Sequence, residues 1–226
     1  MSSYLNILGS NDKFRINNIY CIGKNYMEHI KEFGNDKVPE SPVIFFKPNT
    51  AILQNNSIIN IPEINRKKIS EDVHYEMEMV VAIGKDCKNV NESEAIKYIF
   101  GYGIGIDLTL RDIQSDAKKS GLPWGTAKGF LNSAPVSDIV QKSYVSNPLN
   151  LDINLKINNT IKQFSNTSLM IINIYKLISY ISTIFGLTKG DLIFTGTPEG
   201  VGRLKRGDEL LASLSNLIDL KVRFNG

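Results

Sequence analysis

Two glutamates that lie one residue apart could bind a metal ion. Glu76 and Glu78 stand at the start of the apolar run 79–83, which we interpret as part of a buried strand over 76–83. Side chains of a strand alternate between its two faces, so both carboxylates point the same way and repel each other. A bound cation, or protonation of one carboxyl group, would relieve that repulsion. A solvated strand end, where glutamate is common, is the other interpretation.

A third acid favours the metal site. Asp107 closes the run 100–107, which we interpret as a second strand. Three carboxylates with room for water suit Mg²⁺ or Mn²⁺. Zinc suits them less well, because no cysteine is close and only His74 could supply a nitrogen ligand. A metal with open positions would bind a chelating substrate and act on it as a Lewis acid.

A histidine and a glutamate are spaced for contact on a helix. His29 and Glu32 are i and i+3 in the predicted helix 24–33, and are therefore neighbours. A carboxylate beside an imidazole holds one tautomer and raises its basicity, which suits the activation of water. An incidental pair on a surface helix has the same spacing.

Four further polar residues are candidates for binding an anionic substrate. Each of them taken alone is also consistent with an ordinary surface position. They are Lys47 at the end of the proline-bounded run 42–48, Arg111 and Gln114 in the predicted helix 109–119, and Lys128 in the loop 120–130.

Composition limits the class of protein. The 226 residues contain 42% hydrophobic side chains and carry a net charge of +3. The basic residues are not interleaved with aromatic ones, so nothing indicates a nucleic-acid partner. No apolar run reaches the roughly 20 residues of a membrane span. The two cysteines, Cys21 and Cys87, lie far apart in the sequence, and the N-terminus has no apolar segment of the kind that directs secretion. We therefore predict an intracellular protein, in the cytoplasm or the mitochondrion.

The elements that must position these residues are mainly strands. Helices are predicted over 24–33, 91–99, 109–119 and 168–185, and strands over 19–23, 42–48, 76–83, 100–107, 151–157, 191–195, 208–214 and 218–224. Asn158 and Asn159 supply a hairpin turn. Because helices and strands do not alternate regularly, the pattern favours an α+β fold with a mixed or antiparallel sheet. The length suits a single domain, 19–226, with a short N-terminal extension, 1–18.

The motifs together resemble the fumarylacetoacetate hydrolase superfamily, and most of all its small acylpyruvate hydrolase and oxaloacetate decarboxylase type. They occur in family order and span nearly the whole chain. The matching stretches are 22–26 with His29 and Glu32, 42–48, 75–78, 107–114, 121–124 with Lys128, and 195–202.

The resemblance implies a mixed β-roll fold, usually a homodimer, with Mg²⁺ or Mn²⁺ on Glu76, Glu78 and Asp107. It implies that His29 and Glu32 lie on a lid helix and that Lys128 stabilises a developing enolate. It also implies that three residues position a small 2-oxo acid substrate, namely Arg111, Gln114 and Thr197.

Three hypotheses for the activity follow. The leading one is C–C bond hydrolysis of 3-acylpyruvates such as acetylpyruvate and fumarylpyruvate, or decarboxylation of oxaloacetate, through a metal-bound pyruvate enolate. The alternative is a tautomerase or isomerase of oxaloacetate or a 2-hydroxy-dienoate at the same metal site. The third is a metal-binding or interaction protein without catalytic activity, which the full set of acids, the His29–Glu32 pair and Lys128 speak against.

Overall fold

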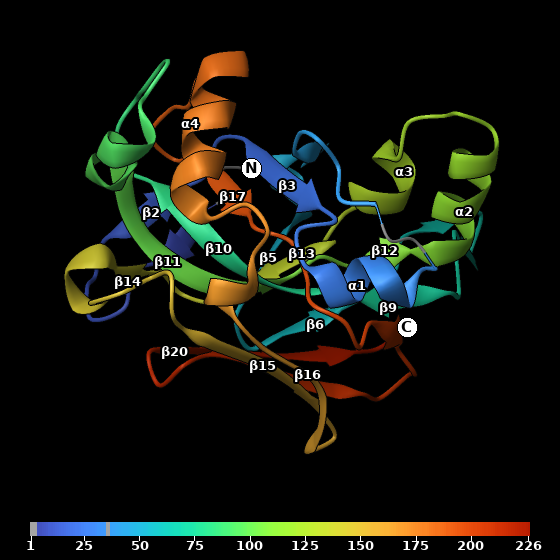
Figure 1. Cartoon of the computed structure of the whole chain (residues 1–226). Helices are drawn as coiled ribbons and strands as arrows, with labels where there is room; N and C mark the ends of the chain where they lie inside the picture. The colour runs from blue at the N-terminus through green and yellow to red at the C-terminus, as the bar shows by residue number, and fades with distance from the viewer. Residues whose placement is uncertain (1–3, 35–36) are drawn as a thin grey trace.

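The computed structural model of the chain describes residues 4–34 and 37–226 and is built from two large sheets with few helices (Figure 1). The predicted α+β class with a mixed sheet is confirmed. The first sheet contains parallel pairs, such as β17 with β3, beside antiparallel ones, such as β10 with β11.

The first sheet carries the candidate metal ligands. Its strand order is β4-β3-β17-β10-β11-β13-β5, with β14 paired to β11. In β10 and β11, Met77 lies opposite Ile106 and Glu78 opposite Gly105, which brings the start of one strand beside the end of the other. Its strands are β3 (Ile19–Gly23), β4 (Val43–Lys47), β5 (Ile52–Gln54), β10 (Met77–Ile83), β11 (Ile99–Ile106), β13 (Ala134–Val136), β14 (Val140–Gln141) and β17 (Leu192–Phe194).

The second sheet has five strands in the order β16-β15-β19-β20-β6. The predicted hairpin is confirmed, because Asn158 and Asn159 join β15 to β16 and both have positive φ angles. The five strands are β6 (Ser57–Ile59), β15 (Asp152–Ile157), β16 (Thr160–Asn166), β19 (Glu209–Leu214) and β20 (Ile218–Phe224). A small three-stranded sheet contains β9 (Val73–Tyr75), β12 (Thr109–Leu110) and β18 (Gly202–Arg203). Two further pairs of strands are β7 (Glu63–Ile64) with β8 (Lys67–Lys68), and β1 (Tyr4–Asn6) with β2 (Lys13–Arg15).

The main core fills the space where the two large sheets face each other. It takes Met77 and Met79 from β10, Leu155 from β15 and Leu220 from β20, all of them fully buried. Glu76 and Glu78 alternate with Met77 and Met79, so the alternation puts the acids on the other side of the strand from this core.

The helices are shorter than predicted. The helix α1 (Met27–Glu32), the helix α2 (Arg111–Lys119) and the helix α4 (Ile174–Ile184) begin later than the predicted 24–33, 109–119 and 168–185. The start of α4 is set by Asn173, whose side chain accepts hydrogen bonds from the N–H groups of Tyr175 and Lys176.

Two local predictions differ from the structure in detail. The predicted helix 91–99 is present as a 3₁₀ helix, η2 (Glu92–Tyr98), and the side chain of Asn91 does not cap it. The predicted loop 120–130 contains a single helical turn, α3 (Gly125–Lys128), which places Lys128. Other 3₁₀ turns are η1 (Asn49–Ala51), η3 (Lys142–Tyr144) and η4 (Thr167–Leu169).

The N-terminal segment packs on the first sheet. Leu5, Phe14 and Ile16 are buried in a second apolar cluster together with Val80 and Ala82 of β10. The division into 1–18 and 19–226 stays a prediction, and residues 1–3 lie outside the described part of the chain. No helix in the described residues has the length and apolar character that a membrane crossing needs.

Candidate active site

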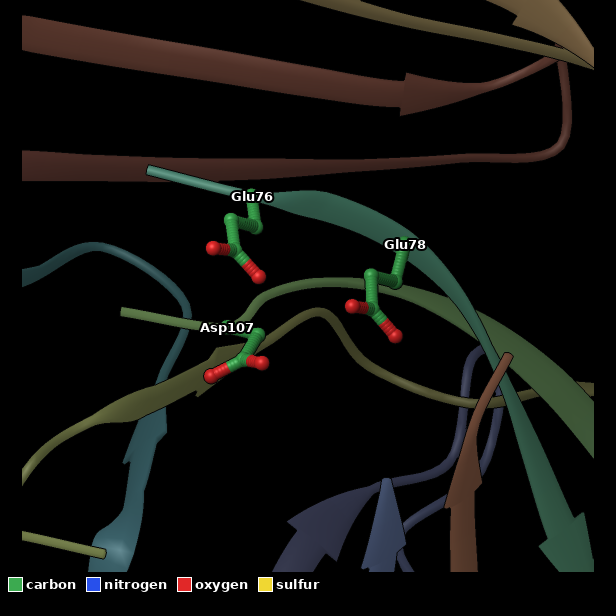
Figure 2. A group of neighbouring side chains, drawn as sticks. All are labelled: Glu76, Glu78 and Asp107. Carbon is green, nitrogen blue, oxygen red and sulfur yellow. The ribbon is translucent and has the colours of Figure 1, made fainter. Parts of the chain in front are cut away.

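Three buried carboxylates converge at one end of the first sheet (Figure 2). Glu76 lies between β9 and β10, Glu78 lies in β10, and Asp107 follows the end of β11. One carboxylate oxygen from each residue lies within 4.8 Å of the others, and all three side chains are buried. The sequence therefore predicted correctly which acids come together, although the strand begins at Met77 rather than at position 76.

Backbone hydrogen bonds fix the positions of these acids. The N–H of Asp107 donates to the carbonyl oxygen of Glu76 at 2.7 Å, which ties the two strands together at the site. The N–H of Met77 donates to the side-chain oxygen of Gln163 at 2.9 Å. The N–H of Gly196 donates to the Glu78 carboxylate at 2.7 Å. These bonds hold the backbone that carries the acids, and the bond from Gly196 also holds the Glu78 carboxylate itself.

Three cations surround two of the three acids. The Lys128 ammonium lies 2.7 Å from an oxygen of Glu76 and 2.7 Å from an oxygen of Asp107. Arg111 donates to the other oxygen of Glu76 at 2.6 Å. Lys47 lies 2.8 Å from the second oxygen of Asp107, without hydrogen-bond geometry at that oxygen. Glu78 has no cationic partner among the described residues.

This asymmetry separates the pKa values of the two glutamates. Burial raises the pKa of Glu78 well above its usual range, and the charges of Asp107 and Glu76 raise it further. Burial acts in the same direction on Glu76, but Lys128 and Arg111 outweigh it and hold the pKa of Glu76 well below its usual range. Burial lowers the pKa of Lys128, and Asp107 and Glu76 more than reverse that effect.

The donor set fits a divalent cation. The Lys128 ammonium already occupies a cation position between Glu76 and Asp107, and Glu78 faces both acids with no counter-ion of its own. Three carboxylates with oxygens this close match the hard oxygen ligands that Mg²⁺ and Mn²⁺ prefer. His74 pairs with Asp72 at 3.1 Å and does not belong to the acid cluster, which argues against a site with a nitrogen ligand.

The predicted His29–Glu32 pair is present on α1. His29 Nδ1 lies 3.2 Å from a carboxylate oxygen of Glu32, whose other oxygen accepts a hydrogen bond from the N–H of Gly200 at 3.1 Å. With its proton on Nδ1, the ring presents the Nε2 lone pair as a base. Burial lowers the pKa of His29, although Glu76 and Glu32 oppose that shift. The neutral, basic form is therefore favoured near neutral pH.

A cavity of about 560 Å³ joins these groups. Most of the predicted site residues line it, so the structure brings together a base, two of the acids and the polar candidates. The lining members are His29, Glu76, Glu78, Arg111, Gln114, Lys128 and Thr197. Gln114 is buried and accepts a 2.6 Å hydrogen bond from Arg111. Asp107 and Glu32 lie behind this lining, in contact with Lys128 and His29.

Lys47 is placed differently from its predicted substrate contact. It is buried beneath Asp107, outside the cavity lining, and donates to the carbonyl oxygens of Leu108 and Lys128 and to the Ser133 hydroxyl. These acceptors draw the ammonium inward, so the geometry supports a role in positioning Asp107.

Sequence reasoning missed Gln163, Gly196 and several residues of the cavity wall. Gln163 is buried on β16 and also donates to Thr197 Oγ1 at 2.9 Å, so it links the acid strand to the 196–200 loop. Gln163 is a polar residue at an inward-facing position of the strand, between the exposed Lys162 and Phe164. A polar residue at such a position is the feature that could have marked it as a site residue. The missed wall residues include Lys24, Phe45, Lys118 and Trp124.

Comparisons with known proteins agree with this geometry. Residues 18–225 match the family model for the fumarylacetoacetate (FAA) hydrolase C-terminal domain. The human protein named oxaloacetate tautomerase FAHD1, mitochondrial, is 42% identical over 206 residues, covering 91% of this chain and 90% of its own. The corresponding Arabidopsis thaliana protein is also 42% identical over 203 residues, covering 90% and 88%.

A solved structure extends the likeness to the whole fold. It is a fumarylpyruvate hydrolase from Pseudomonas aeruginosa, in complex with Mn²⁺ and pyruvate. It superposes with a TM-score of 0.92 at 35% identity, covering 99% of this chain and 96% of the other. The acid cluster, the cavity and these matches lead to one conclusion: the chain belongs to the fumarylacetoacetate hydrolase family.

Proposed function

We propose that the protein is a divalent-metal-dependent tautomerase of oxaloacetate, which interconverts its keto and enol forms. The observation that carries metal-dependent enol chemistry is the presence of His29, with Glu32 behind it, in the same cavity as the acid cluster, and the choice of tautomerisation rests on the similarity to the human relative. Keto–enol exchange needs one base and a means of stabilising negative charge on the 2-oxo oxygen. The 42% identity to the human relative, named for this activity, supports the same choice.

Glu76, Glu78 and Asp107 would hold Mg²⁺ or Mn²⁺. When bound, such an ion supplies Lewis-acid chemistry, which polarises the 2-oxo group and makes the C3 protons more acidic. The Mn²⁺ belongs to the Pseudomonas aeruginosa structure, and the proposal covers either ion.

The chain's own residues provide the proton transfer. His29 Nε2 removes a proton from C3, while Glu32 stabilises the imidazolium that forms. The electrons of the broken C–H bond move to the C2–C3 bond, and the 2-oxo oxygen gains the negative charge. The Lys128 ammonium stabilises that charge. The His29 imidazolium releases its proton to solvent, and a proton from solvent adds to the oxygen, which gives the enol and restores the neutral base. Arg111, Gln114 and Thr197 line the same space and orient the carboxylates.

Hydrolysis of 3-acylpyruvates is the second candidate function. The superposition on a fumarylpyruvate hydrolase favours it. In that reaction His29 would deprotonate a water, and the enolate of pyruvate would leave. Oxaloacetate decarboxylation would need the same charge stabilisation, because loss of CO₂ also produces that enolate.

Parallel assays separate these reactions. Enol absorbance follows tautomerisation of oxaloacetate, and coupled pyruvate detection follows decarboxylation and the cleavage of acetylpyruvate or fumarylpyruvate, each with Mg²⁺ and with a chelator. We expect the fastest metal-dependent turnover in the tautomerase assay. If pyruvate were released faster than the enol and keto forms exchange, the tautomerase proposal would be refuted in favour of a hydrolase or decarboxylase.

Two variants test the residue roles. His29→Ala should lower turnover by about 10²–10⁴-fold, the usual contribution of a general base, while Mn²⁺ binding persists. Glu76→Ala should abolish both turnover and metal binding. Full activity in either variant would refute the assigned role. Homodimer formation and an intracellular location, in the cytoplasm or the mitochondrion, stay predictions from the family resemblance and the sequence.

A further inference from the structure

The side-chain amide of Gln163 is buried between two backbone segments, and its partners fix which way it points. Its oxygen accepts a hydrogen bond from the N–H of Met77 at 2.9 Å. Its nitrogen donates to the carbonyl oxygen of Pro198 at 2.9 Å and to that of Glu199 at 3.3 Å. An N–H group can only donate and a carbonyl oxygen can only accept, so a flipped amide would lose all of these contacts. The residue is only 1% exposed, so bulk water does not replace them.

This orientation determines what the Thr197 hydroxyl can do. The Gln163 nitrogen lies 2.9 Å from Thr197 Oγ1, and because an amide nitrogen can only donate, Oγ1 is the acceptor of this bond. A hydroxyl has one hydrogen and two lone pairs, so Oγ1 keeps its own hydrogen for a different acceptor. Within residues 4–34 and 37–226 the Thr197 hydroxyl donates to no group. Since Thr197 lines the cavity, its O–H is available to an acceptor inside it.

Gln163 itself lies behind the site. It is not part of the cavity lining, so its effect on a bound molecule passes through the residues that it holds. On one side it holds the N–H of Met77, which lies between Glu76 and Glu78 in the sequence. On the other side it holds the loop that carries Thr197. The amide therefore fixes both where the Thr197 hydroxyl lies relative to the acids and which of its hydrogen-bonding positions faces the cavity.

Resting on the proposed function, which puts a 2-oxo acid in this cavity, we propose that Gln163 is a positioning residue that makes Thr197 a hydrogen-bond donor to a carboxylate of the substrate. An ionised carboxylate offers only acceptor oxygens, so it matches a hydroxyl whose hydrogen is left free. The bond is charge-assisted and therefore stronger than one between neutral groups. Gln163 thus favours an anionic oxygen at this point of the cavity without contacting it.

Thr197→Val and Thr197→Ser measure what the hydroxyl contributes. Valine keeps the shape of threonine without the O–H, whereas serine keeps the O–H. A hydrogen bond to a charged group corresponds to about 10- to 100-fold in affinity. Thr197→Val should therefore raise KM for oxaloacetate by at least about 10-fold and leave kcat nearly unchanged. The Kd for oxalate, an unreactive dicarboxylate titrated by calorimetry with Mg²⁺ present, should rise equally. Thr197→Ser should stay close to the unaltered protein.

Gln163→Glu reverses the polarity of the amide on the side of Thr197. One introduced oxygen can still accept the N–H of Met77, while the other replaces the donor and draws the Thr197 hydrogen away from the cavity. KM and the oxalate Kd should rise by about 10-fold. Gln163→Met removes the amide without adding a charge and should raise both values less, because it leaves the hydroxyl free to rotate. Gln141→Glu is the matched control, since it adds the same charge on β14, outside the cavity lining, and should change neither value.

A double-mutant cycle shows whether Gln163 acts through Thr197. In the Thr197→Val background neither Gln163 variant should raise KM or the oxalate Kd further, since the hydroxyl that the amide orients is already absent. Effects that multiply, to about 100-fold for Gln163→Glu, would overturn the proposal, because they would come from charge or from a displaced acid strand. Gln163→Met passes through the same cycle, so the test survives if Gln163→Glu does not fold.

The outcomes separate this proposal from the proposed function. Unchanged KM and oxalate Kd in both Gln163 variants would overturn the role of Gln163 and leave the proposed function standing. If the unaltered protein bound oxalate without turning over oxaloacetate, the proposed function would fall, and the cycle in the oxalate Kd would still decide how Gln163 acts. Failure to bind oxalate as well would overturn both.

Discussion

Glu78→Gln and Glu76→Gln should change the stability of the metal-free protein in opposite directions. The amide introduced at position 78 can still accept the hydrogen bond from Gly196, while the variant removes the charge that has no cationic partner. The amide introduced at position 76 would leave Lys128 and Arg111 facing a neutral group. The two positions lie two residues apart and have the same side-chain chemistry, so each variant is the control for the other.

The repulsion between the carboxylates sets the magnitude. Charges 4.8 Å apart repel by about 3 kcal/mol at an effective dielectric constant near 20. Burial and the charges of Asp107 and Glu76 raise the pKa of Glu78 well above its usual range, so holding its carboxyl group ionised in the folded state lowers folding stability. Glu78→Gln should therefore stabilise the metal-free protein by about 1–3 kcal/mol at pH 7.

The sign follows from linkage. The raised pKa of Glu78 means that its contribution to stability is fully present below pH 4.5 and is lost as the pH rises toward the folded-state pKa. The gain from Glu78→Gln should accordingly be near zero at pH 4.5 and grow with pH. Glu76→Gln should instead destabilise by about 3 kcal/mol at neutral pH, the lower end of the cost of breaking a buried ion pair.

Urea unfolding at several pH values, first with a chelator and then with saturating Mg²⁺, measures both effects. At 100 times Kd the ion should add about 2.7 kcal/mol to the unaltered protein, and most of that gain should be absent from both variants. For a chain of this size, 1 kcal/mol corresponds to a change in Tm of about 2–4 °C. Destabilisation of the metal-free protein by Glu78→Gln at pH 7–8 would refute the argument that Glu78 lacks a counter-ion.

Two further predictions concern the His29 end of the cavity. The turnover rate should fall on acidification with a midpoint below pH 6.5, because burial lowers the pKa of His29. Glu32→Gln should move that midpoint to still lower pH, because Glu32 opposes the shift. An unchanged midpoint in the pH–rate profile of Glu32→Gln would contradict this. Gly200→Ala should lower both folding stability and turnover, because an added Cβ would meet the Lys162 carbonyl and displace the N–H group that holds Glu32. Gly207 has a similar φ and open space around it, so Gly207→Ala should lower folding stability alone.

The sequence was sufficient to predict the acid cluster because strand geometry is local. Alternation along β10 put Glu76 and Glu78 on one face, and the end of β11 supplied Asp107. The helical spacing of His29 and Glu32 likewise needed only residues three apart. Contacts of this kind follow from the period of one element, and the two-residue period of strands likewise predicted most of the strands, while the Asn158-Asn159 pair predicted the hairpin turn.

Lys47 and Gln163 could not be placed in this way. The direction of the Lys47 side chain depends on acceptors at positions 108, 128 and 133, which the chain brings together only in the folded state. Gln163 acts through the N–H of Met77, which is 86 positions away. The 3₁₀ helix η2 shows the same limit, since its residues have ordinary α-helical propensity and its hydrogen-bond pattern depends on packing.

The proposed function gives Lys128 a second role beside its contacts with Glu76 and Asp107, and the two cannot be filled at the same moment. While its ammonium lies 2.7 Å from both Glu76 and Asp107, it serves as their counter-ion and is drawn away from a substrate oxygen. Glu76, Glu78 and Asp107 would hold the divalent ion, and the charge of Glu76 and Asp107 would then be shared between that ion and the Lys128 ammonium. Lys128 would be less tightly paired and, under the proposed function, better able to stabilise negative charge on the substrate, while the ion would supply Lewis-acid chemistry. Removing the metal should for that reason cost more activity than the loss of a Lewis acid alone.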